Sequence, residues 1–224
     1  MYDFSGKIAV VTGAAQGLGE AIAKRFLNDG IPGVALLDLN EEVLAATAAR
    51  LDPEGNRVMP VACDVSDPDS VAQAFQAVER RFGTVDILVN NAGILSLKKP
   101  FVEYTKADWD KIFGINFMGD VFFCKALIPT MKEKKSGRII NMASQSAETG
   151  GLAASPIYAA SKAAVWCMTK SLAGEMGPYQ VTVNAVAPGY IMTEMTRNAG
   201  YRDDMVPMKR LGTPEDVADV VGFL

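Results

Sequence analysis

Short apolar runs rich in β-branched residues alternate with helical patterns along the first part of the chain, and this alternation is the strongest constraint on the fold. Apolar runs without polar alternation are typical of strands that are buried on both faces, as in parallel sheets. Short connections between such strands and helices predict right-handed crossovers. The predicted strands are residues 7–12, 34–39, 56–63 and 85–90, and the helices between them are 17–28, 41–51 and 67–82.

The second half of the chain continues the same pattern. It contains a long helical region at 106–133, a strand at 138–142, a helix that begins near Pro156, a strand at 181–187 and a last helix that begins after Thr213. No linker, repeat or low-complexity segment interrupts this order. We therefore predict one α/β domain over residues 1–224, with a doubly wound parallel sheet of the Rossmann type in a three-layer α/β/α arrangement.

Composition narrows the chemistry that the chain can perform. The chain has no histidine, which excludes every Ser-His-Asp relay and every His-ligated metal site. We expect no metal. Proton transfer would then fall to Tyr, Lys, Asp, Glu or Cys. Tyr158 and Lys162 are four residues apart, which places them on one face of a helix, and the small hydroxyl of Ser144 lies upstream.

Charge and cysteine content indicate which kinds of macromolecule the protein can bind and in which cellular compartment it works. The net charge is −4, so no basic footprint for nucleic acid is present. The three cysteines lack CxxC spacing and have apolar neighbours, which indicates buried thiols in a reducing compartment. The N-terminus lacks the features of a signal peptide, and no apolar run approaches the ~20 residues that span a bilayer. We expect a cytoplasmic protein without a membrane or nucleic-acid partner.

A glycine-rich turn follows the first predicted strand. Its glycines, Gly13, Gly17 and Gly19, have the spacing GxxxGxG instead of GxGxxG. Gly13 can permit a sharp turn, Gly17 can let backbone amides approach a pyrophosphate, and Gly19 can let the helix pack close to the sheet. The alternative is a glycine-rich loop that binds no ligand.

Asp38 stands near the end of the second predicted strand, 19 residues after Gly19. A carboxylate at this place holds the adenosine ribose hydroxyls in dinucleotide-binding folds. It would repel the extra phosphate of NADP, and Gln16 in the turn offers no cation for that phosphate. NAD is therefore the expected cofactor, with NADP disfavoured. The alternative is a helix N-cap region, because Asn40 and acidic residues follow.

Other polar residues stand where strands are predicted to end. Asp64 closes the third strand where an adenine could lie, although it also precedes a good helix start. Asn90 and Asn91 lead into Ala92 and Gly93, a backbone-shaping turn at a ligand crevice. Asn116 interrupts an apolar helical stretch, and its alternative interpretation is a satisfied buried amide that bends the helix.

Together these motifs resemble the short-chain dehydrogenase/reductase family, in its standard single-domain branch. The resemblance covers essentially the whole chain. It depends on the joint order and spacing of Thr12-Gly13-x-x-x-Gly17-x-Gly19, Asn90-Asn91-Ala92-Gly93, Asn116, Ser144, Tyr158-x-x-x-Lys162 and Pro188-Gly189. The family implies an NAD(P)-dependent oxidoreductase that acts on an alcohol or carbonyl and assembles as a homodimer or homotetramer. The helix after Pro156, apolar around most of its circumference, agrees with a subunit interface.

The resemblance also implies roles for individual residues. Tyr158 would exchange a proton with the substrate oxygen, Lys162 would hold the nicotinamide ribose and favour tyrosinate, Ser144 would bind the substrate oxygen, and Asn116 would support a proton path behind Lys162. A cation one helical turn away should lower the phenol pKa from its usual value of ~10. The expected cofactor-binding residues are Gly13, Gln16, Gly17, Leu18, Gly19, Asp38, Leu39, Asp64, Val65, Asn90, Ala92, Gly93, Tyr158, Lys162, Pro188, Gly189, Ile191 and Thr193. The expected substrate-binding residues are Ser144, Ser146, Leu152, Tyr158 and Tyr190.

The substrate class is less constrained than the reaction. A mixed apolar and polar pocket suits a small or medium secondary alcohol such as a polyol or sugar. The first alternative is a 3-oxoacyl-[acyl-carrier-protein] reductase. It is less favoured, because an acidic chain does not attract the acidic carrier protein. A more distant alternative is an NAD-binding module without turnover. The sequence stops inside an apolar helical pattern, whereas the family continues into another strand and a tail, so we expect that these are absent from the sequence.

Overall fold

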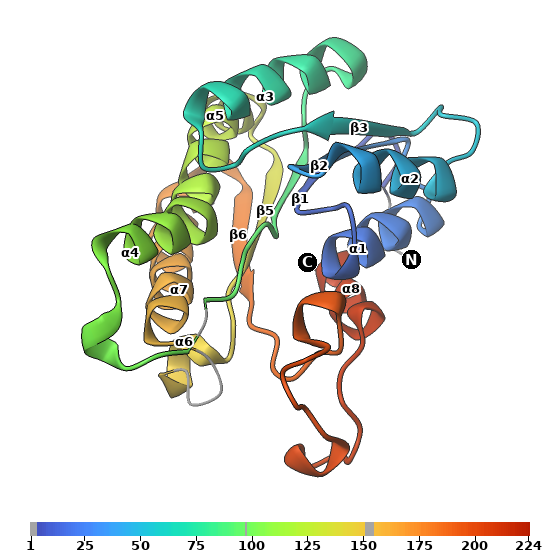
Figure 1. The fold of residues 1–224 in the computed structure, drawn as a ribbon. Helices are drawn as coiled ribbons and strands as arrows, with labels where there is room; N and C mark the ends of the chain where they lie inside the picture. Colours follow the sequence, from blue (N-terminus) through green and yellow to red (C-terminus); the bar gives the residue numbers. More distant parts are fainter. Residues whose placement is uncertain (1–3, 97, 151–154) are drawn as a thin grey trace.

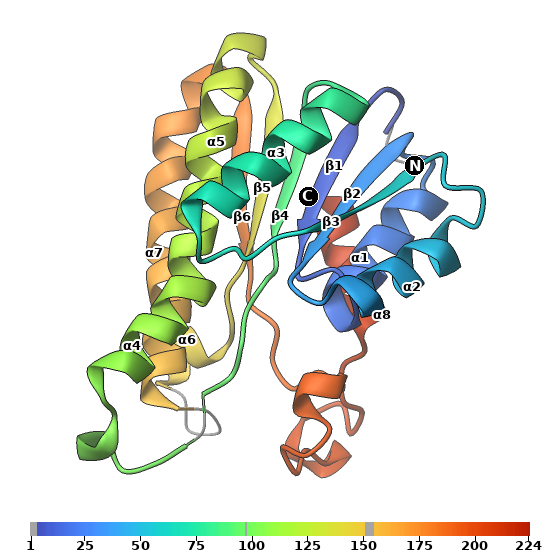
Figure 2. The same ribbon diagram turned by 45° about the horizontal axis from the view of Figure 1, so that its top comes forward.

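Within the residues that it describes, the computed structural model (Figure 1) has one sheet of six parallel strands, as predicted, in the order β3-β2-β1-β4-β5-β6, which can be followed in Figure 2. The structure describes residues 4–96, 98–150 and 155–224. Most strand boundaries differ from the predicted ones by one or two residues. The strands are β1 (Ile8–Thr12), β2 (Gly33–Asp38), β3 (Val58–Ala62), β4 (Ile87–Asn90), β5 (Gly137–Met142) and β6 (Val181–Val186).

Helices cover both faces of this sheet, which makes the three-layer arrangement visible in Figure 2. Ile22 and Phe26 of one helical layer pack on β1 and β2, and Phe123 and Leu127 of the other pack on the opposite face. The first layer consists of α1 (Gly17–Asn28), α2 (Glu41–Leu51) and α8 (Pro214–Phe223). The second consists of α3 (Pro68–Phe82), α5 (Gly119–Lys134) and α7 (Pro156–Met176).

The order of the strands fixes where a ligand can bind. Strands β2 and β3 lie on one side of β1, and β4, β5 and β6 lie on the other side. The strand order therefore switches direction between β1 and β4, which are neighbours and pair through Val10 and Leu88. In open parallel sheets, ligands bind at such a switch point, beyond the carboxyl ends of the strands. The Ser155 side chain caps the first turn of helix α7 by accepting a hydrogen bond from the Tyr158 amide at 3.2 Å.

The helical region predicted at 106–133 is confirmed, and it runs without a break over Lys106–Lys134. The structure divides this region into α4 (Lys106–Phe113), a π-helical turn (Gly114–Met118) and α5. The turn contains Asn116, whose side chain bonds to the Ile94 backbone outside the helix. A π-helical turn inside an α-helix is frequent at functional sites.

The same region, Lys106–Lys134, is 29 residues long, and an 18-residue window within it has a mean hydropathy of 1.4, which is apolar enough for a membrane-spanning helix, contrary to the expectation that no such run exists. Its Asn116 and Asp120 are buried, and α5 packs against β4 and β5. It is therefore a core helix of this domain. Cys167 was also wrongly expected to be buried: it is exposed on α7, whereas Cys63 and Cys124 are buried.

Shorter elements complete the cleft end of the domain. A bridge between Ile191 and Gly212 closes the long segment after β6 at its base. That segment contains two 3₁₀ turns. The short elements are η1 (Phe101–Glu103), α6 (Ser146–Thr149), η3 (Gly177–Tyr179), η4 (Glu194–Thr196) and η5 (Asp203–Met205).

Candidate active site

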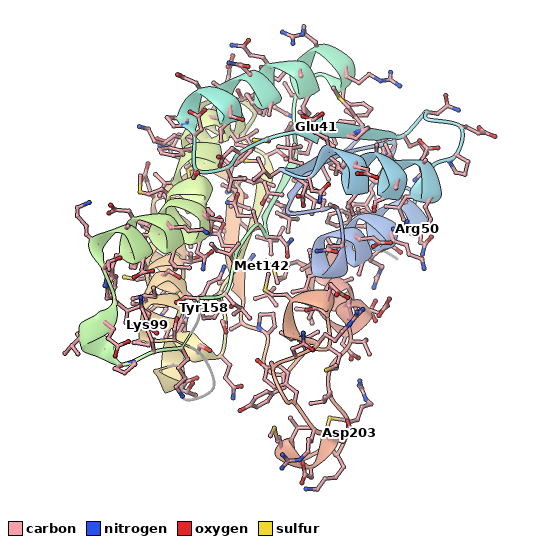
Figure 3. The ribbon with its side chains drawn as sticks, in the orientation of Figure 1. Glu41, Arg50, Lys99, Met142, Tyr158 and Asp203 are labelled. Atoms are coloured by element: carbon pink, nitrogen blue, oxygen red, sulfur yellow. The ribbon has the colours of Figure 1, made fainter. Side chains whose placement is uncertain are left out.

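A cavity of about 470 Å³ opens at the carboxyl ends of the strands. It extends from the turn between β1 and α1 to α6, the first turns of α7 and the segment after β6. Met142, at the end of β5, and Tyr158, on α7, lie near the middle of the molecule in Figure 3, with Asp203 at the far end of the segment after β6. The cavity therefore lies where the strand order predicts a ligand.

The glycine turn shapes one end of the cavity. Gly13 and Gly17 both have φ of +62°, a left-handed conformation that strongly favours glycine. A side chain at Gly13 would approach the Ala92 Cα to 2.8 Å, so the turn also touches the loop after β4. Gly13 thus forms the sharp turn expected from the sequence, and the approach of Gly17 to a pyrophosphate stays a prediction.

Gly19 brings α1 against the turn, and we expect Gly19→Ala to destabilise the fold. Its Cβ would overlap the Gly13 carbonyl oxygen and lie 2.8 Å from the Ala14 Cα, both of which are backbone atoms. Overpacking of this kind typically costs about 1–3 kcal/mol, measurable as a lower urea midpoint. In Gly174→Ala, on α7, the new Cβ meets nothing within 4 Å, so this control should gain up to about 1 kcal/mol from helix propensity. Equal effects of the two substitutions would contradict the close approach at Gly19.

Asp38 lies at the same end of the cavity, with each carboxylate oxygen held by one backbone amide. Its Oδ2 accepts a hydrogen bond from the Ala15 amide and its Oδ1 from the Asn40 amide, both at 3.1 Å. Asn40 in turn caps α2, so the capping role belongs to Asn40 and not to Asp38. The geometry leaves the carboxylate of Asp38 fixed at the cavity wall.

Asn91 connects the first and fourth strands, a role that the sequence analysis missed. Its side-chain amide donates to the backbone oxygens of Thr12 at 2.8 Å and Gly13 at 3.0 Å. The Thr12 hydroxyl accepts hydrogen bonds from the Asn91 and Ala92 amides at 2.9 Å. Asn91 lines the cavity, whereas Asn90 turns inward and donates to Asn141 Oδ1 at 2.9 Å. Because side chains alternate along a strand, period-two counting could have separated these two asparagines.

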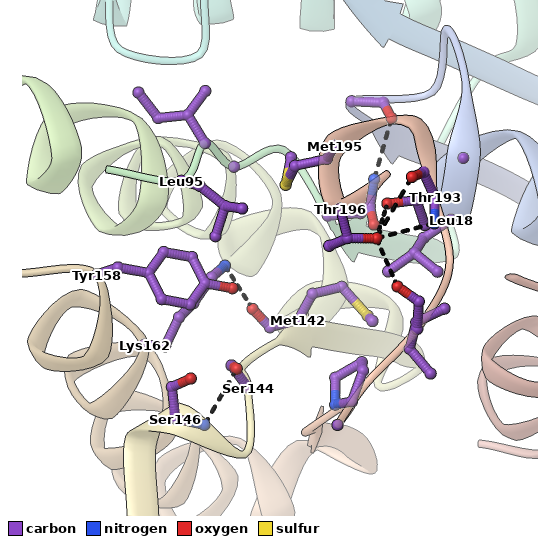
Figure 4. A pocket seen from close by; sticks show the side chains of 18 of the residues that line it. Leu18, Leu95, Met142, Ser144, Ser146, Tyr158, Lys162, Thr193, Met195 and Thr196 are labelled. Atoms are coloured by element: carbon purple, nitrogen blue, oxygen red, sulfur yellow. Dashed lines mark hydrogen bonds between the residues drawn. The ribbon is translucent and has the colours of Figure 1, made fainter. Parts of the chain in front are cut away.

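Ser144, Tyr158 and Lys162 converge at the other end of the cavity (Figure 4). The Lys162 ammonium is buried and donates to the Met142 carbonyl oxygen at 2.7 Å. Ser144 Oγ accepts a hydrogen bond from the Ser146 amide at 3.1 Å, which fixes the serine at the start of α6. The structure thus brings together all three residues, although Ser144 is on a different element from the other two.

The acidity of the Tyr158 phenol differs from the expectation. Burial raises its pKa above the usual value, and a hydrogen bond with Ser144 only partly opposes this increase. Burial also lowers the pKa of Lys162, because the charged ammonium is far from water. The expected decrease took account of the neighbouring cation alone; the cost of burying the phenolate acts in the opposite direction and outweighs it.

Asn116 is fully buried, and both polar atoms of its side chain form hydrogen bonds. Its Oδ1 accepts from the Ile94 amide at 2.8 Å, and its Nδ2 donates to the Ile94 carbonyl at 3.0 Å and to Ser161 Oγ at 3.2 Å. A side chain built at Gly93 would meet both Asn116 Oδ1 and Lys162 Nζ at 3.4 Å. Asn116 therefore fixes the loop after β4 next to the buried lysine.

The other predicted residues divide into two groups. Gly19 and Asn116 support the cavity from behind, and the cofactor roles assigned to the residues outside the cavity wall stay predictions. The predicted residues that line the cavity are Gly13, Gln16, Gly17, Leu18, Asp38, Gly93, Ser144, Ser146, Tyr158, Lys162, Pro188, Gly189, Tyr190, Ile191 and Thr193. Those outside the lining are Gly19, Leu39, Asp64, Val65, Asn90, Ala92 and Asn116, while Leu152 falls outside the described residues.

Leu39 and Asp64 are two of the residues outside the lining. Leu39 is 71% exposed, beyond the end of β2. Asp64 Oδ1 accepts from the Ser66 amide at 2.9 Å and from the Ser66 hydroxyl at 2.6 Å, so this carboxylate serves the start of α3.

Several lining residues were not predicted as site residues. Tyr201 packs edge-on against Tyr190, with ring centroids 4.8 Å apart, and its proximity contributes to the raised pKa of Tyr158. Its position 43 residues after Tyr158 gave no local signal. Other unpredicted lining residues are Asn91, Ile94, Gln145, Thr149, Glu194 and Thr196.

Comparison with known proteins gives consistent results. The family model described as short chain dehydrogenase matches residues 7–204. A D-threitol dehydrogenase from Mycolicibacterium smegmatis is 40% identical, over 100% of this chain and 88% of that protein. A 3-oxoacyl-[acyl-carrier protein] reductase with bound NAD from Brucella melitensis has a TM-score of 0.89 and 37% identity, over 97% of this chain and 83% of that one. An L-sorbose reductase from Gluconobacter frateurii, complexed with NADPH and L-sorbose, has a TM-score of 0.88 and 33% identity, over 97% and 89%.

Proposed function

The chain belongs to the short-chain dehydrogenase/reductase family, and on that premise we propose that it transfers a hydride between NAD(H) and a small secondary alcohol or ketone of the polyol or sugar class. The observation that carries this proposal is the convergence of Ser144, Tyr158 and Lys162 at one end of a cavity whose other end holds the glycine turn and Asp38. A carboxylate at the ribose position favours NAD, because it would repel the extra phosphate of NADP.

The residues present fit a dinucleotide. The turn at Gly13 and Gly17 has the left-handed conformation that exposes backbone amides, and α1 begins at the same place, so its N-terminus would favour a pyrophosphate. Asp38 would accept hydrogen bonds from the adenosine ribose, and Lys162 would hold the nicotinamide ribose. When bound, the nicotinamide supplies hydride transfer, which no side chain can perform.

The side chains would then manage the proton. In alcohol oxidation, Tyr158 Oη in its phenolate form accepts the proton from the substrate hydroxyl, and the Ser144 hydroxyl holds the same substrate oxygen. The phenolate has to form in spite of its burial. The Lys162 ammonium, one helical turn away, is the nearby positive charge that would stabilise it. In ketone reduction, the same phenol donates the proton.

A polyol or sugar suits the polar groups at the substrate end. Gln145, Ser146, Thr149 and Tyr201 offer amide and hydroxyl groups around the catalytic cluster. Sites that hydrogen-bond substrate hydroxyls reject analogues without them, since their own polar groups would be left unpaired. The names of two similar proteins, a D-threitol dehydrogenase and an L-sorbose reductase, agree with this substrate class.

A second candidate is reduction of a 3-oxoacyl thioester on an acyl carrier protein, which the similarity to the Brucella reductase favours. An acidic carrier requires a cationic surface near the cavity mouth. In the described segment after β6, Arg197, Arg202 and Arg210 each form an ion pair with a nearby acidic residue. These arginines are less able to attract a carrier, and we therefore rank this function second.

A panel of substrates separates the two functions. We expect absorbance-monitored turnover with NAD on four- to six-carbon polyols, and little turnover of acetoacetyl thioesters with NADH or NADPH. Turnover only of the thioesters would establish the second function instead. Binding of NADH without turnover of any compound in the panel would support an NAD-binding module.

Assembly and location follow the family resemblance and the composition. We propose a homodimer or homotetramer that works in the cytoplasm, without a membrane or nucleic-acid partner. The apolar character of α7 and the net charge of −4 support these proposals.

A further inference from the structure

Asp120 is a buried carboxyl group that the proposed reaction does not yet use. It lies in the first turn of α5, with only 3% of its surface exposed. Its Oδ2 is buried and has no hydrogen-bond partner among the described residues. Buried carboxyl groups without partners are expensive, so such a residue needs a specific reason.

The surroundings of Asp120 supply that reason. Asn116, Asp120 and Cys124 follow one another at intervals of four residues across the junction of the π-helical turn and α5. Asn116 donates a hydrogen bond to Ser161, the neighbour of Lys162 in sequence. The Cys124 sulfur accepts a hydrogen bond from Asn90 Nδ2 at 3.6 Å. This row of side chains therefore faces the buried interior behind the catalytic cluster.

Two titratable groups face Asp120, one from α7 and one from its own helix. Lys162 on α7 is close enough that each group shifts the other: its charge lowers the pKa of Asp120, and Asp120 raises the pKa of Lys162. Burial outweighs the lysine and raises the pKa of Asp120 to about 8, so its carboxylate forms at alkaline pH, the range in which Lys162 would otherwise lose its proton. Cys124 cannot share this titration, because burial raises the pKa of its thiol to about 12. The Asn90 side chain that adjoins Cys124 is neutral.

Lys162 depends on this carboxyl group. The ammonium makes a hydrogen bond to the Met142 carbonyl oxygen, which is neutral. Burial favours loss of its proton, and the only opposing charge that acts on it within the described residues is that of Asp120. A neutral Lys162 could no longer stabilise the Tyr158 phenolate, so the charge of Lys162 is a requirement of the proposed chemistry.

We propose that Asp120 is a positioning residue for catalysis: its buried carboxylate is the internal counter-ion that keeps the Lys162 ammonium charged beside Tyr158. This inference rests on the proposed function for its effect on turnover, but the coupling between the two side chains exists without any substrate. Asp120 lies outside the cavity lining and acts only through Lys162.

The test is the pH profile of kcat/KM for Asp120→Asn, which removes the charge and keeps the shape. Removing the carboxylate lowers the pKa of Lys162, so the decline of kcat/KM at high pH should move to lower pH by about one unit. Asp110→Asn is the matched control, because Asp110 on α4 is exposed and pairs with Lys106. It should leave the profile unchanged. A profile of Asp120→Asn that coincides with that of the wild type overturns the proposal, whatever happens to kcat.

Thermal unfolding tests the same coupling without turnover. The wild type, Asp120→Asn, Lys162→Met and the double variant form a cycle measured at one alkaline pH, at which the carboxylate of Asp120 is ionised. In the Lys162→Met background the carboxylate has lost its cation, so Asp120→Asn should raise the Tm there more than in the wild type. Equal Tm changes in the two backgrounds overturn the proposal. If the amide prevents folding, Asp120→Ser removes the charge and should show the same pH shift and the same non-additivity.

The two kinds of failure can be told apart. A wild type that turns over no substrate refutes the proposed function, while the Tm cycle still decides the coupling. A wild type that is active, with an unshifted profile in Asp120→Asn, refutes only the role of Asp120.

Discussion

Replacing Tyr158 by phenylalanine should lower kcat for the proposed alcohol oxidation by about 10³-fold, because it removes the group that accepts the substrate proton. The aromatic ring stays, so the wall of the cavity keeps its shape. Lys162 remains bound to the Met142 carbonyl oxygen, and Asp38 remains bound to the Ala15 amide of the glycine turn. NADH should therefore bind with nearly the affinity of the wild type. Steady-state kinetics and a fluorescence titration with NADH measure the two quantities separately.

A second tyrosine provides the control. Tyr179, in η3 at the far end of α7, is exposed and packs against the Lys132 ammonium, outside the cavity. Tyr179→Phe removes the same hydroxyl group and should leave kcat unchanged. Substantial residual turnover in Tyr158→Phe would show that another group accepts the proton, and the assignment of Tyr158 would then fail.

The sequence predicted the fold well where local and tertiary preferences agree. The runs that became β1 and β2 are apolar and β-branched, and their burial on both faces of the sheet required no further information. The π-helical turn inside the helix at 106–133 could not be predicted in the same way. It depends on Asn116 bonding to Ile94, 22 residues earlier in the chain, and such a contact exists only after β4 and this helix have packed together.

The candidate site was predicted through family resemblance more than through physical pattern. The i,i+4 spacing of Tyr158 and Lys162 is local, so it could be read directly from the chain. Asp120 and Tyr201 gave no such signal, because each reaches this end of the molecule from a distant segment. The raised pKa of Tyr158 was missed for a related reason: burial depends on the whole fold, whereas the neighbouring cation is visible in the sequence.

Asp38 should make the wild type prefer NAD over NADP by about 100-fold in kcat/KM. The extra phosphate of NADP would lie against a carboxylate that two backbone amides hold in place, and a like-charge contact of this kind costs several kcal/mol. Asp38→Asn keeps an oxygen that can accept a hydrogen bond from the ribose but removes the charge. It should therefore raise kcat/KM with NADP and bring the preference close to unity, with both cofactors measured on the same substrate.

Asp64→Asn is the matched control, since it removes one carboxylate at the end of the neighbouring strand β3. Asp64 is engaged by Ser66 and lies outside the cavity lining, so its loss should change the kinetics with the two cofactors equally and leave the ratio unaltered. A wild type with comparable kcat/KM for NAD and NADP would refute the role of Asp38 in cofactor choice. A ratio that changes in Asp64→Asn but not in Asp38→Asn would instead place the adenosine ribose phosphate beside β3.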